Sequence, residues 1–184
     1  MANDRLPAGL EADFAAAARL ASGRQTKATV RMTMLHIGDE DLAVLSGQGD
    51  KPDAVQRIAL GAARVARDFF HHDPPTSREI ERAIDFVEDE IMRLGRPAAL
   101  ATTVWGTGLA LQAWAAVAGS TMTIELVEQW FQRLASASLG QPRALQGLPA
   151  GREAAATLLV LREFMHHRGH ASIVAVELPG AAAQ

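Results

Sequence analysis

The sequence predicts an α/β fold in which helices pack around a single β-sheet. Residues 28–46 hold two strand patterns joined by a turn, and further along the chain helix patterns alternate with strand patterns near residues 98–104 and 171–177. The long helical segments also carry an apolar stripe on one face, which needs a sheet or another helix to cover it. Strands followed by alternating helices and strands are typical of a layered α/β domain.

The N-terminal part begins with a predicted helix at residues 10–22, where Leu10 and Phe14 lie at helical spacing. We expect residues 1–26 to form a helical extension in front of the main domain, which spans residues 27–178. The two strands that follow are rich in alternating apolar residues, and a polar turn at residues 38–41 makes them a hairpin. They are expected at residues 28–36 and 41–46.

Residues 54–70 are ambiguous, because their apolar residues fit a helix period that Gly61 interrupts. Glycine inside a helix costs about 1 kcal/mol relative to alanine. Pro74 and Pro75 end this segment. Thr76 and Glu79 then form a capping box that starts a long amphipathic helix, which stops at Gly95.

The second half of the chain alternates strands and helices. The longest uncharged run, residues 97–124, is rich in small and polar residues, so we interpret it as a buried strand, turn and helix and not as a membrane span. The predicted elements are a strand at 98–104, a turn at 106–108, a helix through Ala118, a helix capped by Thr123, a helix at 152–167, a strand at 171–177 and a disordered tail at 179–184.

Composition excludes several classes of function. The chain has 184 residues, of which 48% are hydrophobic and 21% charged, as in one soluble globular domain. A net charge of -3 without a basic block gives no reason to expect binding to nucleic acid or to an anionic membrane. No cysteine is present, which excludes disulfides and thiolate chemistry and fits a cytoplasmic protein without a secretory signal.

One segment resembles a known family. Residues 58–80 read Ile-Ala-Leu-Gly-Ala-Ala-Arg-Val-Ala-Arg-Asp-Phe-Phe-His-His-Asp-Pro-Pro-Thr-Ser-Arg-Glu-Ile. The Gly-x-x-Arg element, followed after a short gap by Asp-Pro-Pro-Thr and a long helix, resembles the exopolyphosphatase and guanosine pentaphosphate phosphatase (Ppx/GppA) family. The resemblance runs over residues 28–177, with further similar runs at 126–139 and 143–152.

The resemblance implies a fold. Enzymes of that family have two ribonuclease-H-like lobes of the actin-like fold with the active site between them, and this chain is similar to the second lobe only. We therefore expect one actin-like lobe with a five-stranded mixed sheet, a third strand at residues 54–60, a turn at Gly61 and a helix at 62–70. The family's catalytic carboxylate belongs to the first lobe, which we expect this chain to lack.

The family's first glycine-rich loop in this lobe reads Asp-Ile-Gly-Gly-Gly-Ser-x-Glu, and backbone N–H groups of such loops hold phosphate oxygens. Residues 36–43 of this chain read His-Ile-Gly-Asp-Glu-Asp-Leu-Ala. His36 stands at the position of the metal-associated Asp, and three carboxylates lie where phosphate would bind. Like-charge repulsion predicts that this loop repels phosphate.

The other phosphate-binding elements are kept only in part. The family loop Gly-Gly-Thr-x-Thr-Thr corresponds to residues 105–110, where Trp105 replaces a glycine, and the Glu that follows the Gly-x-x-Arg element is Arg67. The residues that the resemblance leaves as a residual phosphate site are Gly38, Gly61, Arg64, Gly106 and Thr107.

We therefore expect a degenerate, noncatalytic Ppx/GppA-like domain that acts by binding a protein partner or a ligand, with no catalytic residue, metal ligand or cofactor assigned. The alternative is residual exopolyphosphatase or guanosine pentaphosphate phosphohydrolase activity, or phosphate-ligand sensing. In that case the five residual residues would form an anion cradle, and Mg²⁺ would be needed for hydrolysis.

Other polar clusters are interpreted as ordinary structure. The histidines at 71–72 and 166–170 lie near predicted helix C-termini, where His interacts favourably with the helix dipole, so capping or exposure is preferred to a Zn²⁺ or Ni²⁺ site. The acidic run at residues 81–90 predicts a solvated helix face and not a Mg²⁺ site.

Four aromatic residues lie on apolar stripes and are predicted to be core residues: Trp105, Trp114, Trp130 and Phe131. A lobe separated from its neighbour would expose the face that packs against it, and such a patch marks association. We expect a homodimer or a protein partner at this inter-lobe face, near Trp105 and the turn at 106–108.

Overall fold

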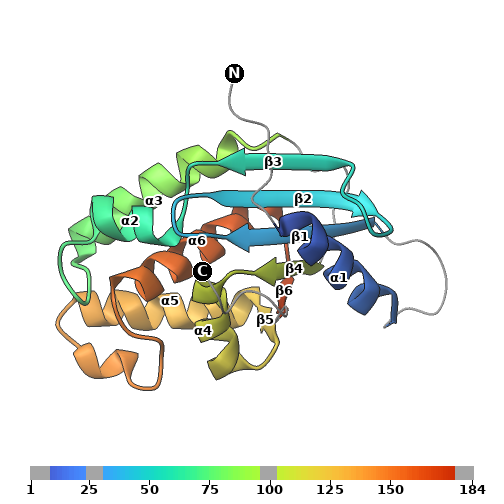
Figure 1. Cartoon of the computed structure of the whole chain (residues 1–184). Helices are drawn as coiled ribbons and strands as arrows, with labels where there is room; N and C mark the ends of the chain where they lie inside the picture. Colours follow the sequence, from blue (N-terminus) through green and yellow to red (C-terminus); the bar gives the residue numbers. More distant parts are fainter. Residues whose placement is uncertain (1–8, 24–30, 96–102, 177–184) are drawn as a thin grey trace.

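The structure is a computed structural model that describes residues 9–23, 31–95 and 103–176. Its centre is one mixed sheet with the strand order β3-β2-β1-β4-β6-β5 (Figure 1). The pairs β1–β4 and β4–β6 are parallel, and the other neighbours are antiparallel. The strands are β1 (Arg31–Ile37), β2 (Leu42–Gln48), β3 (Ala54–Ile58), β4 (Thr103–Thr107), β5 (Thr121–Thr123) and β6 (Ser172–Ala175).

The predicted α/β sheet with flanking helices is confirmed, including a third strand at β3, but the number of five strands is wrong. Strand β5 adds a sixth, at the edge of the sheet beside β6. Its three residues are too few to show an alternating pattern, and the last of them, Thr123, also caps the next helix. The cap could therefore be predicted from the sequence, whereas the strand could not.

Strand β4 lies further along the chain than predicted. Gly106 and Thr107 were assigned to a turn, whereas the structure places both in β4 and leaves only Gly108 outside it. Glycine is a common turn residue, but at position 106 it serves close packing: a Cβ atom there would overlap the side chains of Leu111 and Ile173. The predicted strand residues 98–102 lie outside the described residues, as do 28–30, 177 and the tail at 179–184.

Most helices pack on one face of the sheet. The predicted capping box between Thr76 and Glu79 is confirmed at the start of α3, and the predicted cap at Thr123 is confirmed at α5. Among the described helices, none is both long and apolar enough to cross a membrane. The described residues form two hydrophobic clusters, and the larger one includes residues from five helices. These helices are α2 (Ala62–Phe69), α3 (Ser77–Met92), α4 (Leu109–Ala118), α5 (Ile124–Ser138) and α6 (Arg152–Arg168), and a 3₁₀ turn lies at Pro142–Leu145.

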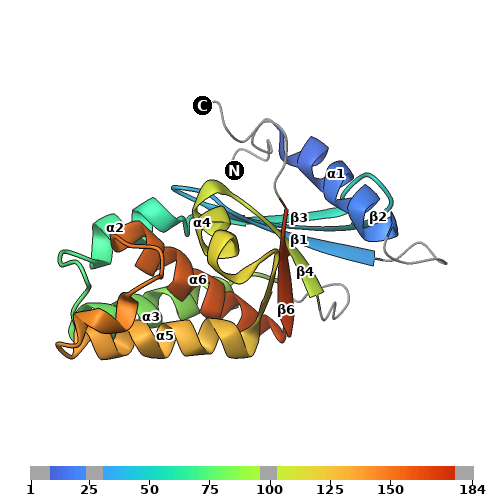
Figure 2. The same cartoon turned by 90° about the horizontal axis from the view of Figure 1, so that it is seen from below.

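The opposite face is covered by α1 (Leu10–Gly23), as Figure 2 shows. Alternation along β1 directs Leu35 and Ile37 to the large cluster and Met32 and Met34 to α1. Phe14 of α1 is fully buried in this second cluster. The N-terminal helix is therefore part of the packed structure of the sheet.

The four predicted core aromatics are all buried, which confirms that prediction. Trp114 and Trp130 pack against each other with ring centroids 5.0 Å apart. Trp105, however, lies in the cluster under α1. Trp105 itself therefore does not form an exposed surface, and the association face expected near it stays a prediction.

This packing predicts that α1 contributes strongly to stability. Phe14→Ala should lower the free energy of unfolding by about 3–5 kcal/mol, the usual cost of a large cavity. Leu20→Ala is the control on the same helix, because Leu20 is 51% exposed, and its cost should stay below about 0.5 kcal/mol. Urea unfolding of both variants measures the difference; equal small losses would mean that α1 is not docked in solution.

Candidate functional site

The candidate site lies at the carboxyl ends of β1 and β4, where the two parallel strands are neighbours. Their register places His36 beside Thr107, and alternation directs both side chains to the α1 face. The Nδ1 atom of His36 lies 3.0 Å from the hydroxyl of Thr107, within hydrogen-bond distance. The hydroxyl is buried with its residue, so this pair is fixed inside the fold.

Helix α1 adds Asp13 to this pair, a residue that the sequence analysis did not single out. Burial raises the pKa of the Asp13 carboxyl, and the nearby charge of His36 opposes that effect. Burial likewise lowers the pKa of His36, against the opposing influence of Asp41, Asp13 and Asp39. Because the net shift is downward from an ordinary value of 6.5, the imidazole is neutral at pH 7.

The turn after β1 closes on the start of α2. Within the turn, the Gly38 amide donates to the Asp41 carbonyl at 2.9 Å. The Ala62 amide donates to the Gly38 carbonyl at 2.9 Å, and the Arg64 amide donates to the Asp39 carbonyl at 3.0 Å. The backbone of the turn thus occupies the helix N-terminus, the place where an anion would bind.

Gly61 permits this contact. It is the N-cap residue of α2 and offers no side-chain cap, and a Cβ atom on it would overlap the Asp39 carbonyl. Gly108, which the site prediction did not include, permits a similar close approach of two backbone segments, here between the end of β4 and the end of β1. Its φ of 116° is unusual for any other residue, and a Cβ atom there would overlap the Ile37 carbonyl.

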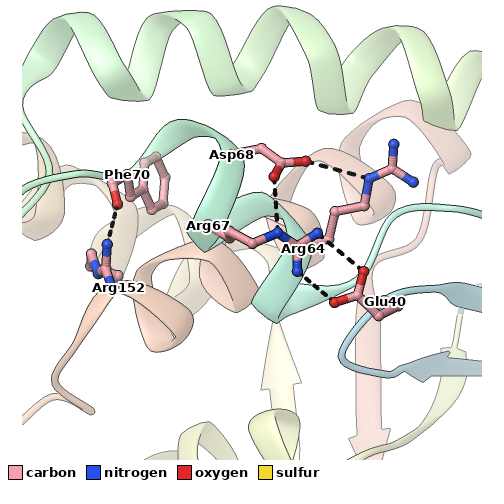
Figure 3. Close-up of polar contacts among 6 residues, drawn as sticks. All are labelled: Glu40, Arg64, Arg67, Asp68, Phe70 and Arg152. Atoms are coloured by element: carbon pink, nitrogen blue, oxygen red, sulfur yellow. Dashed lines mark hydrogen bonds and ion pairs between the residues drawn. The ribbon is translucent and has the colours of Figure 1, made fainter.

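Two of the turn's three carboxylates, Glu40 and Asp41, are paired with arginines, as Figure 3 shows for Glu40. Arg67 donates to Glu40 through two nitrogens, at 2.7 and 3.2 Å, and this pairing lowers the pKa of the Glu40 carboxyl. Arg57 forms an ion pair with Asp41. The repulsion expected among the turn's carboxylates is thereby offset by neighbouring cations.

Arg64 points along its own helix. Its Nε lies 3.6 Å from a carboxylate oxygen of Asp68 (Figure 3). Its guanidinium lies 6.0 Å from the ring centre of Phe86 on α3. At the other end of α2, Arg152 donates to the Phe70 carbonyl at 2.9 Å. Contacts at both ends therefore hold α2 in place.

The five predicted site residues thus lie at one end of the sheet, but each makes a different contact. Gly38 and Gly61 meet in the closed turn, Gly106 packs within β4 and Thr107 bonds to His36. Arg64 uses its amide on the turn and its side chain on α3. At the α2 N-terminus, the amides of Ala62 and Arg64 are bonded to carbonyls of the turn.

The family model of the Ppx/GppA phosphatase family matches residues 11–174. This chain belongs to the Ppx/GppA family. The match begins inside α1, which agrees with the docking of that helix on the sheet. No curated protein matches the chain.

Solved structures of the family share the fold. A crystal structure of the Aquifex aeolicus Ppx/GppA family member is similar with a TM-score of 0.68 and 18% identity, over 94% of this chain and 59% of that one. An exopolyphosphatase from Cytophaga hutchinsonii is similar with a TM-score of 0.61 and 12% identity, over 90% of this chain and 59% of its own. The chain thus spans about three fifths of the length of these relatives.

The family resemblance associates the position of His36 with a metal, and the residues at this site do not suit Mg²⁺. Magnesium takes oxygen ligands, whereas His36 presents an imidazole whose Nδ1 already bonds to Thr107. Within residues 9–23, 31–95 and 103–176, no three His or carboxylate side chains are grouped so that they could hold a metal ion.

The histidine clusters have partners within the fold. The Nδ1 of His72 lies 2.9 Å from buried Glu79, which also accepts hydrogen bonds from the backbone amides of Thr76 and His71. Burial alone would raise the pKa of Glu79, but these bonds outweigh it and lower the pKa to about 2. His167 lies 3.3 Å from the buried carboxylate of Glu163.

The neutral state of His36 predicts a pH dependence. Its pKa is lower in the folded than in the unfolded chain, so the unfolded chain binds the proton more readily and stability falls as pH drops below about 6.5. His36→Gln should flatten the profile of melting temperature against pH below that value. His71→Gln, at an exposed position, is the control and should keep the parent profile. Parallel profiles for all three proteins would contradict this assignment.

The closed turn predicts a cost for any side chain at position 61. Gly61→Ala should lower the free energy of unfolding by about 1–3 kcal/mol, because the turn or the helix must move away from the new methyl group. Gly23→Ala is the control, since a Cβ atom there meets nothing within 4 Å. Thermal and urea unfolding test this, and equal stability of the two variants would show that the turn is open in solution.

Proposed function

We propose that this chain is a noncatalytic member of the Ppx/GppA family that acts by binding and not by hydrolysis. The observation that carries the proposal is the closed turn at residues 38–41. Its own carbonyls accept the hydrogen bonds of the Ala62 and Arg64 amides. Phosphate binding at this helix N-terminus would require those bonds to break and the turn to move.

The charges around the turn support the same proposal. Tight phosphate binding uses cations that converge on the anion. Arg57, Arg64 and Arg67 each pair with a carboxylate of this chain: Asp41, Asp68 and Glu40 respectively. A polyanion would have to compete with these three carboxylates for the same arginines.

The chemistry of His36 adds a further argument. The position that the family resemblance associates with a metal holds a neutral imidazole whose Nδ1 is engaged by Thr107. A neutral imidazole brings no positive charge to this partly buried place, so a phosphate would meet the turn's carboxylates without help from His36. These residues therefore favour a binding role that does not depend on phosphoanhydride cleavage.

A protein partner is the occupant that we propose for the face beside Gly108. Helix α4 follows that glycine and has no charged residue, and it exposes Leu109 to 67% and Val117 to 46%. The rest of each relative's length has no counterpart in this chain, so a partner with an apolar surface of its own suits this helix. We place the interaction in the cytoplasm, in keeping with the cysteine-free sequence.

The proposal predicts no phosphate release from long-chain polyphosphate or guanosine pentaphosphate. Micromolar protein with Mg²⁺ should match its heat-inactivated blank, while an active family enzyme in the same assay gives the positive control. Release above the blank that is lost in Arg64→Ala would refute the noncatalytic role. It would then support the alternative of residual phosphatase activity.

Ligand sensing without hydrolysis needs its own measurement. Because the α2 N-terminus is occupied, polyphosphate should not raise the melting temperature of the parent protein. Arg64→Ala is the matched variant, since Arg64 is the one charged residue of the predicted cradle. A rise in the parent that Arg64→Ala abolishes would establish a phosphate sensor in place of the proposed protein-binding role.

A further inference from the structure

Strand β3 forms one edge of the sheet, and its outer side has no partner strand among the described residues. Figure 1 shows it as the outermost strand, beyond β2. At the opposite edge, β5 is only three residues long and lies against α4 and α5. The longer edge strand is therefore the one that presents open backbone N–H and C=O groups.

The residues of β3 do little to protect this edge. Soluble proteins commonly place lysine, proline or inward-pointing charges on such strands. The sequence of β3 is Ala-Val-Gln-Arg-Ile, and its one charge, Arg57, is already paired with Asp41 of the neighbouring turn. Val55 is 42% exposed on the side of the sheet that α1 covers further inward.

We propose that β3 pairs in antiparallel fashion with β3 of a second copy of this chain, so that the two sheets become continuous. A two-fold axis at Gln56 aligns all five residues: Gln56 faces its own copy, Val55 faces Arg57, and Ala54 faces Ile58. No like charges meet in this register, and the aliphatic part of Arg57 covers the exposed Val55.

The strand favours a copy of itself over an unrelated peptide because its sequence is self-complementary in this register. The two Gln56 residues lie opposite each other on the face where the Gln56 side-chain amide lies beside Gly95, and the apolar residues lie opposite one another or opposite an aliphatic stem. Arg57 of this strand also pairs with Asp41 of the turn, but strand pairing at the outer edge of β3 uses neither the amides of the α2 N-terminus nor α4. It therefore stands whether or not the chain hydrolyses phosphate.

A single cysteine tests the register, because the chain contains none. Residues directly opposite in an antiparallel pair have Cα atoms about 4.5–5.5 Å apart, which a disulfide can span. Gln56→Cys should therefore give a disulfide-linked dimer on mild oxidation, seen on a nonreducing gel and lost on reduction. Leu139→Cys, at a position 75% exposed at the end of α5, should stay monomeric on the gel.

Light scattering measures the oligomeric state of the parent protein and of a variant whose β3 edge is disrupted. The parent should scatter as a dimer at high micromolar concentration. Val55→Lys should scatter as a monomer with an unchanged circular dichroism spectrum, because the new lysine faces Arg57 of the copy and the site is exposed. A monomeric parent overturns the proposal. A dimer in which the Gln56→Cys variant crosslinks no more than the Leu139→Cys variant also overturns it, since the contact then lies elsewhere.

Discussion

The arrangement at the carboxyl end of the sheet depends on the contact between the turn at residues 38–41 and the first turn of α2. The first amides of any helix need acceptors, and Gly61 supplies no side chain for this purpose. The carbonyls of Gly38 and Asp39 take that role, so the hairpin and the helix become one unit. The surrounding ion pairs are largely exposed and add little to this backbone contact.

Glycines at this end of the sheet have steric roles within the fold. Gly61 and Gly108 allow backbone to approach backbone, and Gly106 allows β4 to pack on Leu111 and Ile173. Each of these needs is steric and would exist without any phosphate ligand. A glycine at a family position therefore supports the fold of this chain and does not by itself support its activity.

Local signals were predictable from the sequence, and distant contacts were not. The caps at Thr76 and Thr123 are set by residues three positions away, and both are found as predicted. The bond between Arg67 and Glu40 joins residues 27 apart, and Asp13 reaches His36 only because of the way α1 docks on the sheet. Periodicity predicts that α1 has an apolar face; the surface that it covers, and hence the burial of Trp105, depends on tertiary packing.

The charged turn at residues 38–41 lies outside the hydrophobic core of this fold. The two hydrophobic clusters lie on opposite faces of the sheet and do not include the turn's charged residues. Where the family pattern has glycine and Glu, this chain has Glu40 and Arg67, which bond to each other. A lone carboxylate at position 40 would raise the negative potential of the turn, and a lone arginine at 67 would leave an open cation for phosphate. Because they bond to each other, each offsets the charge of the other beside the closed turn.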